Sequence, residues 1–124
     1  MKNNIGVKGE EVATDYLKRK GYKIIEKNYT NNLGRQLGEI DIIAKEKDAF
    51  VFVEVKTRNL KNYSETLPEE NITQSKLRKL SKIANQYLYT NKLLEKPYRF
   101  DAISVWLDIE NNLAKVKHIE SIYL

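Results

Sequence analysis

Apolar residues recur at helical spacing in two stretches of the chain. In residues 8–20 they are followed by a basic last turn and by Gly21, which can end a helix in the left-handed conformation. In residues 73–89 they form one continuous stripe. The apolar positions are Val12, Ala13, Tyr16 and Leu17 in the first stretch, and Leu77, Leu80, Ile83, Ala84, Tyr87 and Leu88 in the second. The pattern predicts two amphipathic helices.

Residues 38–58 alternate instead with a period of two. Two apolar segments flank the charged residues 45–48, which is the pattern of a β-hairpin. One predicted face is wholly apolar and carries Ile40, Ile42, Ala44, Val51, Val53 and Val55. The other predicted face carries Glu39, Asp41, Ile43, Phe52, Glu54 and Lys56. A register that sets Asp41 opposite Glu54 sets Glu39 opposite Lys56, and opposed carboxylates repel unless a cation lies between them.

Three further strands complete the predicted order of elements. We expect them at residues 22–29, 100–107 and 113–123, the last two joined around an Asn-Asn pair, and a long polar loop at residues 59–71. The resulting order is α-β-β-β-α-β-β over residues 1–124. This order predicts a single α/β domain with a central mixed β-sheet flanked by helices.

Composition narrows the function classes. The 124 residues are 41% hydrophobic and 31% charged, as in globular proteins, and include no cysteine and one histidine. A disulfide framework and thiolate metal sites are therefore excluded, and a zinc hydrolase is disfavoured. Neither a membrane-spanning run nor a signal peptide is evident, so we expect a cytoplasmic protein without a membrane partner. The net charge of +5 favours a polyanionic partner such as nucleic acid.

The acidic residues suggest a metal site. Glu10 shares the inward stripe of the first helix with Ala13 and Leu17, where a carboxylate is costly unless it is paired or binds metal. Mg²⁺ and Mn²⁺ prefer oxygen ligands, which Asp41 and Glu54 would supply. The alternatives are a first-turn acid that complements the helix dipole and a hairpin face that is simply charged and solvated.

Further groups fit the hydrolysis of a phosphodiester. The backbone carbonyl of Val55 is an additional candidate ligand, and Glu10 could reach the ion through water. Lys56 projects from the same predicted face as Glu54, where it would hold the attacking water and stabilise the transition state. Acids that bind metal, a lysine and a basic surface together suggest metal-assisted cleavage of nucleic acid.

Asp41 followed by Glu54-Val55-Lys56 across a hairpin resembles the PD-(D/E)xK nuclease motif of restriction-endonuclease-like folds, with Ile40 in place of the motif's proline. The chain also resembles the YraN family of small bacterial proteins, predicted endonucleases similar to archaeal Holliday-junction resolvases. The matching stretches are Gly9-Glu10-x-x-Ala13-x-x-Tyr16-Leu17, Gly38-Glu39-Ile40-Asp41, Phe52-Val53-Glu54-Val55-Lys56-Thr57-Arg58, Lys76, and Arg99-Phe100-Asp101.

The resemblance implies a Mg²⁺- or Mn²⁺-dependent endonuclease that acts on DNA of branched or structured character. It implies an active centre made of Glu10, Asp41, Glu54 and Lys56, with Glu39 nearby. It also makes a homodimer reasonable, because cleavage of a branched junction usually needs two active centres. The rival interpretation is a non-catalytic nucleic-acid-binding or interaction module on the same fold.

Basic residues outside the motif are candidates for phosphate contacts. They are Arg58 and Lys61 beside the long loop, and Lys76, Arg78, Lys79 and Lys82 on the second helix. The alternative for the second helix is a solvated face.

A few remaining residues are open to a structural or a functional interpretation. We expect Tyr16 and Tyr87 in the core, Trp106 in the core or at an interface, and His118 in a structural role, while Tyr63 is the candidate for base stacking. Arg99 and Asp101 either position the site or form a structural ion pair, and we favour the structural role.

Overall fold

The computed structural model describes residues 4–31, 38–63 and 73–122. The elements follow the predicted order, with one short 3₁₀ helix (η1) at the start of the predicted loop. They are α1 (Asn4–Arg19), β1 (Lys23–Thr30), β2 (Glu39–Glu46), β3 (Ala49–Asn59), η1 (Leu60–Asn62), α2 (Gln74–Thr90), β4 (Tyr98–Asp108) and β5 (Leu113–Ile119). The rest of the predicted loop, residues 64–72, lies outside the described residues.

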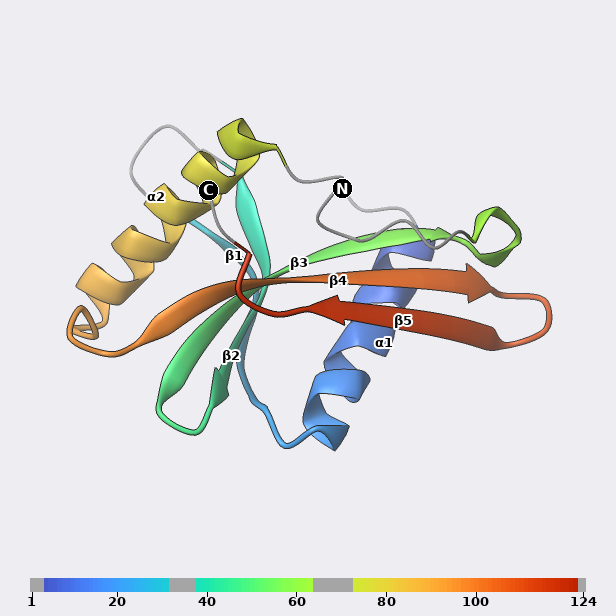
Figure 1. Ribbon diagram of the computed structural model, residues 1–124, viewed down its shortest axis with the longest axis horizontal. Helices are drawn as coiled ribbons and strands as arrows, with labels where there is room; N and C mark the ends of the chain where they lie inside the picture. Colours follow the sequence, from blue (N-terminus) through green and yellow to red (C-terminus); the bar gives the residue numbers. More distant parts are fainter. Residues whose placement is uncertain (1–3, 32–37, 64–72, 123–124) are drawn as a thin grey trace.

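The five strands form one mixed sheet in the order β1-β2-β3-β4-β5. Neighbouring strands are antiparallel except β3 and β4, which are parallel and joined through α2. The two helices lie on opposite faces of the sheet, and α1 crosses behind β4 and β5 in Figure 1. The predicted mixed α/β sheet flanked by helices is confirmed, and it is consistent with a restriction-endonuclease-like fold.

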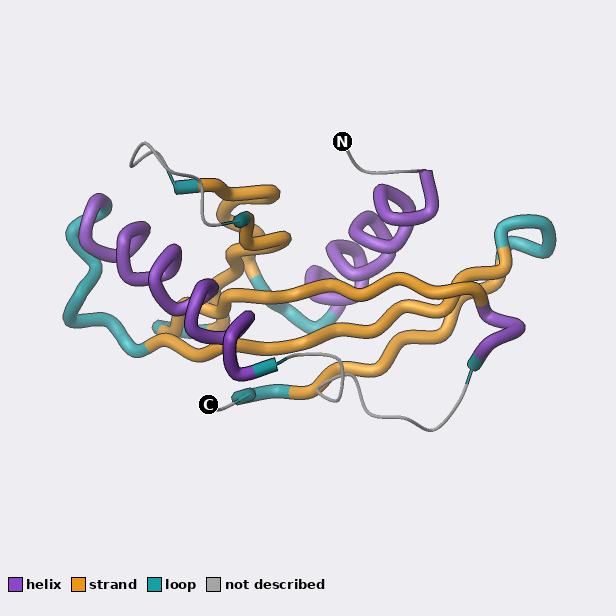
Figure 2. Tube along the Cα trace, turned by 90° about the horizontal axis from the view of Figure 1, so that it is seen from above, coloured by secondary structure: helices purple, strands orange, loops and turns teal. Residues whose placement is uncertain are grey.

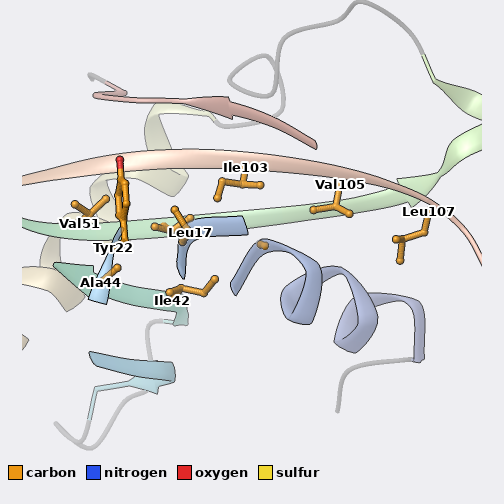
Figure 3. Close-up of a cluster of buried hydrophobic side chains, with 10 residues drawn as sticks. Leu17, Tyr22, Ile42, Ala44, Val51, Ile103, Val105 and Leu107 are labelled. Carbon is orange, nitrogen blue, oxygen red and sulfur yellow. The ribbon is translucent and has the colours of Figure 1, made fainter. Parts of the chain in front are cut away.

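Helix α1 is pressed closely onto the sheet. Ala13 and Leu17 pack against apolar side chains of β2, β3 and β4, as Figure 3 shows for Leu17. Gly9 permits the approach, because a Cβ atom at this position would lie 1.8 Å from Thr57 Oγ1. The helix ends as predicted: Gly21 has φ +94°, and the Tyr22 amide donates to the Leu17 carbonyl at 3.0 Å. Glu10, one position after Gly9, is thereby held beside the sheet.

Helix α2 covers the other face. The Thr73 side chain caps it by accepting from the Lys76 amide at 3.1 Å. All six residues predicted for its apolar stripe are buried, and five of them pack with Ile43, Phe50 and Phe52 of the hairpin. None of the helices among the described residues is long and apolar enough to cross a membrane.

The hairpin register is the predicted one, but the face assignment is wrong at Ile40. Residues pair from Glu46–Ala49 to Ile42–Val53. Ile40 packs in the α2-side cluster with Ile43, whereas Ile42 packs on the α1 side. The reason lies at Asp41, whose Oδ2 accepts from the Val55 amide at 2.8 Å just beyond the last paired residues. The prediction assumed an uninterrupted ladder, and the alternation fails where the ladder ends.

Candidate metal centre

Three carboxylates converge where β2 leaves its pairing with β3. Glu10 comes from α1, and Glu39 and Asp41 come from the first residues of β2. One oxygen of each carboxylate lies within 4.8 Å of the others. Glu10 is 6% exposed and Asp41 5% exposed, while Glu39 is half-buried. The inward position predicted for Glu10 is confirmed.

Neutral N–H groups hold these carboxylates in place. The side-chain amide of Asn28 donates to Glu10 Oε1 at 2.9 Å and to Glu39 Oε1 at 3.2 Å. Asn28 lies in β1 with φ +55°, a left-handed conformation that asparagine tolerates better than most residues. Sequence reasoning missed Asn28. The one available signal was an asparagine within a predicted strand, where that residue type is depleted.

The arrangement fits a hard divalent cation. All donor atoms of the cluster are carboxylate oxygens, which Mg²⁺ and Mn²⁺ prefer. Three carboxylates gathered in a largely buried place repel one another, and a cation among them offsets that repulsion. The Val55 amide that donates to Asp41 places the Val55 backbone beside the cluster, while the ligand role of its carbonyl stays a prediction.

Glu54 lies next to the cluster rather than within it. Glu39, Asp41 and Glu54 line one cleft of about 470 Å³, whose other wall is the start of α2. Lys76 Nζ lies 2.8 Å from Glu54 Oε1, so an ion pair spans the cleft from β3 to α2. The structure therefore brings Glu10, Asp41 and Glu39 together and sets Glu54 beside them. The sequence had placed Glu39 only nearby.

The predicted basic residues lie in four places. Lys76 and Lys79 line the cleft, while Arg78 and Lys82 are exposed elsewhere on α2. Lys56 is exposed on β3 and is not among the described residues that line the cleft. Arg58 and Lys61 lie farther along, at the end of β3 and in η1, and the Arg58 guanidinium is 5.9 Å from the Trp106 ring centroid.

The residues expected to be structural pack as predicted. Tyr87 and Trp106 are buried, and Tyr16 packs against the α1-side core. Arg99 Nε donates to Asp101 Oδ1 at 3.0 Å, which confirms the ion pair. Tyr63 packs edge-on against Trp106, with 5.0 Å between ring centroids.

His118 joins this ion pair within the fold. Its Nε2 lies 2.8 Å from Asp101 Oδ2, and its Nδ1 lies 3.1 Å from the Tyr16 hydroxyl. Burial by itself would raise the pKa of Asp101, but the hydrogen bonds from His118, Arg99 and the Ser121 amide outweigh it. The pKa therefore lies below its ordinary value.

Comparison with known proteins places the chain in a family. Residues 9–105 match the model of the uncharacterised protein family UPF0102. A UPF0102 protein of Caldanaerobacter subterraneus subsp. tengcongensis is 44% identical over 119 residues, which cover 95% of this chain and 93% of that protein. A UPF0102 protein of Caldicellulosiruptor saccharolyticus is 37% identical, and the match covers 98% of this chain and 98% of that protein. A UPF0102 protein of Alkaliphilus oremlandii is 41% identical, and the match covers 99% of this chain and 100% of that protein. The chain belongs to the uncharacterised protein family UPF0102.

Proposed function

We propose that this protein is a Mg²⁺- or Mn²⁺-dependent endonuclease that hydrolyses phosphodiester bonds in branched or otherwise structured DNA. The observation that carries the proposal is the convergence of Glu10, Glu39 and Asp41 within 4.8 Å, beside a cleft with lysines on its opposite wall. The resemblance of Asp41 and Glu54-Val55-Lys56 to the PD-(D/E)xK motif adds to it. An acidic group holds the cation, and the lysines receive the phosphates that surround the reacting bond.

Each residue has a role in this proposal. Glu10, Glu39 and Asp41 would hold the ion, which when bound would polarise the phosphodiester and lower the pKa of the attacking water. Asn28 and the Val55 amide orient the carboxylates. Substrate phosphates would compete with Glu54 for Lys76, which would leave the Glu54 carboxylate, on the same wall of the cleft as Asp41, available to the ion or to the attacking water.

Lys56 follows Glu54 by two residues on the same strand. Successive side chains of a strand alternate between its faces, so Lys56 projects from the same face as Glu54. The exposed ammonium group is therefore available to a phosphodiester that enters the cleft, where it stabilises charge that grows on the phosphoryl oxygens.

Cleavage of a labelled panel of single-stranded, duplex, flap and four-way-junction DNA tests the proposal. We expect cutting with Mn²⁺ or Mg²⁺, none with EDTA, and none in Asp41→Asn or Glu54→Ala. Asp15→Asn is a matched control, because Asp15 is an exposed acid on α1 away from the cluster. Retained activity in folded Asp41→Asn would contradict the assignment. A parallel panel of RNA determines whether DNA is the preferred substrate.

One observation favours a second candidate, a nucleic-acid-binding module without catalysis. Lys76 neutralises Glu54, and an ion pair that survived substrate binding would leave that carboxylate without a catalytic role. Thermal unfolding distinguishes the candidates, because an ion that binds only the folded state raises its stability. The nuclease requires a Mn²⁺-dependent rise that Asp41→Asn lacks, whereas the binding module predicts DNA binding without such a rise.

A further inference from the structure

Four basic residues lie in two rows on one face of the sheet, next to the candidate metal centre. In the β3–β4–β5 register, Lys56, Ser104 and Lys117 form one row, and Arg58, Trp106 and Lys115 form the next. Both rows are on the α2 side, because the intervening Ile103 and Val105 pack on the α1 side. We call Lys56, Arg58, Lys115 and Lys117 the cationic surface.

The cationic surface is continuous with the cleft through β3. Glu54, which lines the cleft, precedes Lys56 by two residues and Arg58 by four, so the three side chains follow one another along one face of the strand. Each such step spans roughly 6.6 Å. Helix α2 lies over one end of the long strands only, as Figure 2 shows, and the rows of the cationic surface lie toward the other end.

Two aromatic rings hold three of the cations together. Tyr63 and Trp106 pack edge-on, the Arg58 guanidinium lies 5.9 Å from the Trp106 centroid, and Lys115 Nζ lies 4.2 Å from the Tyr63 centroid. Lys117 Nζ is 5.6 Å from the same Tyr63 ring. Cation–π contacts offset part of the repulsion among the like charges and restrict the long side chains before a ligand arrives.

We propose that the cationic surface binds the phosphate backbone of one nucleic acid strand, as the continuation of the strand that enters the cleft. Clustered cations with an ordered arrangement favour a ligand with regularly repeated negative charge. Lys115 already occupies a face of the Tyr63 ring, so Tyr63 positions a lysine here rather than stacking a base. The claim that the cationic surface binds a strand depends only on the residues of that surface. The claim that the same strand continues into the cleft rests on the proposed nuclease function.

Binding to a labelled oligonucleotide in EDTA tests the proposal without cleavage. We compare the wild type with Lys115→Ala/Lys117→Ala at several salt concentrations. The binding constant falls as salt rises, and each phosphate contact makes the slope of log K against log salt steeper. Loss of two contacts should therefore make this slope shallower by about 1.4 on a single strand and by about 1.8 on a duplex. Single-stranded and duplex arms therefore also show which form supplies the backbone.

Three variants provide matched controls, and a fourth tests the contribution of the Tyr63 ring. Lys8→Ala/Lys18→Ala removes the same charge from exposed positions of α1, on the opposite face of the sheet, and should leave the slope unchanged. Lys115→Arg/Lys117→Arg keeps the charge and should leave the slope of log K against log salt unchanged. Tyr63→Phe should also retain binding, whereas Tyr63→Ala should weaken it because the lysines lose their ring contact.

Three outcomes would overturn the proposal that the cationic surface binds nucleic acid. They are no oligonucleotide binding by the wild type, an unchanged slope of log K against log salt in Lys115→Ala/Lys117→Ala, or an equal change of slope in Lys8→Ala/Lys18→Ala. Failure of the nuclease proposal would have a different signature, namely intact binding with this slope change but no metal-dependent cleavage. If both proposals hold, the double variant should cleave with a raised KM and a nearly unchanged kcat.

Discussion

Two groups of carboxylates lie within the fold, and they differ in what surrounds them. Asp101 is 1% exposed and is held by Arg99, His118 and the Ser121 amide. Glu10 and Asp41 are almost as buried, yet their carboxylates converge with a third acid, and the neutral amides of Asn28 and Val55 orient them. A carboxylate matched by basic groups stabilises the fold. Three carboxylates whose oxygens lie within 4.8 Å of one another are instead a candidate site for a ligand of opposite charge.

The surroundings of Arg99 show how fully the first group is matched. Its guanidinium also donates to Glu46, Glu120 and the Tyr22 hydroxyl. Burial raises the pKa of Tyr22 to about 12, so the phenol stays neutral in this network at physiological pH. The network ties the start of β4 to the end of β2 and to the residues that follow α1 and β5.

The largest expected effect is the loss of stability on breaking this network. Asp101→Ala removes the buried member of the network and leaves the half-buried Arg99 without its main partner. We expect a loss of about 3–5 kcal/mol in the free energy of unfolding, measured by urea denaturation. Asp48→Ala is the matched control, because Asp48 and Lys96 form an exposed ion pair that contributes about 1 kcal/mol or less. Equal losses in the two variants would refute the structural role of Asp101.

Asp41→Asn should behave in the opposite way. In EDTA we expect its stability to equal or exceed that of the wild type, because the substitution removes one of three converging charges. Excess Mn²⁺ at one hundred times its Kd should stabilise the wild type by about 2.7 kcal/mol and the variant by almost nothing. Urea denaturation with and without Mn²⁺ measures both values. A variant as unstable as Asp101→Ala would mean that Asp41 is a structural residue.

A substitution at Asn28 separates the effect of carboxylate orientation on metal affinity from the effect of carboxylate charge. Asn28→Gly removes the amide but accepts the left-handed φ of +55°, so the fold should be retained. We expect Mn²⁺ affinity to fall about 10- to 100-fold, as for other residues that orient metal ligands, measured by calorimetric titration. Asn112→Gly is the matched control, since Asn112 has the same φ in the β4–β5 turn. Unchanged affinity in Asn28→Gly would show that Asn28 does not position the site.

The sequence was sufficient to predict those elements whose residue pattern depends only on neighbouring positions in the chain. The stripe of α2, the end of α1 at Gly21 and the hairpin register all follow from spacing that neighbouring residues determine. The inward position of Glu10 could be predicted for the same reason, because it follows from helical periodicity around Ala13 and Leu17.

The membership of the acidic cluster depends on contacts between distant segments, which periodicity does not report. Glu39 joins Glu10 because β2 departs from its ladder at Asp41, and Asn28 reaches both through an unusual backbone conformation in β1. The pairing of Glu54 with Lys76 depends on how α2 docks across the cleft. The partnership of Lys115 with Tyr63 likewise joins residues 52 positions apart in the chain.

The smallest expected effect is an acid-induced loss of stability that belongs to Asp101. Its pKa in the folded protein lies below its ordinary value, so it binds a proton more readily when the chain is unfolded. Stability from this group is therefore present above about pH 4 and is lost as the pH falls through the folded pKa. One proton contributes at most about 1.4 kcal/mol per pH unit. Urea denaturation between neutral pH and the acid limit of folding should show this slope in the wild type and a shallower one in Asp101→Asn. Asp41→Asn should retain the pH-dependent stability that Asp101 contributes. If Asp41→Asn abolished this pH dependence, the two groups of carboxylates would not differ in the way proposed here.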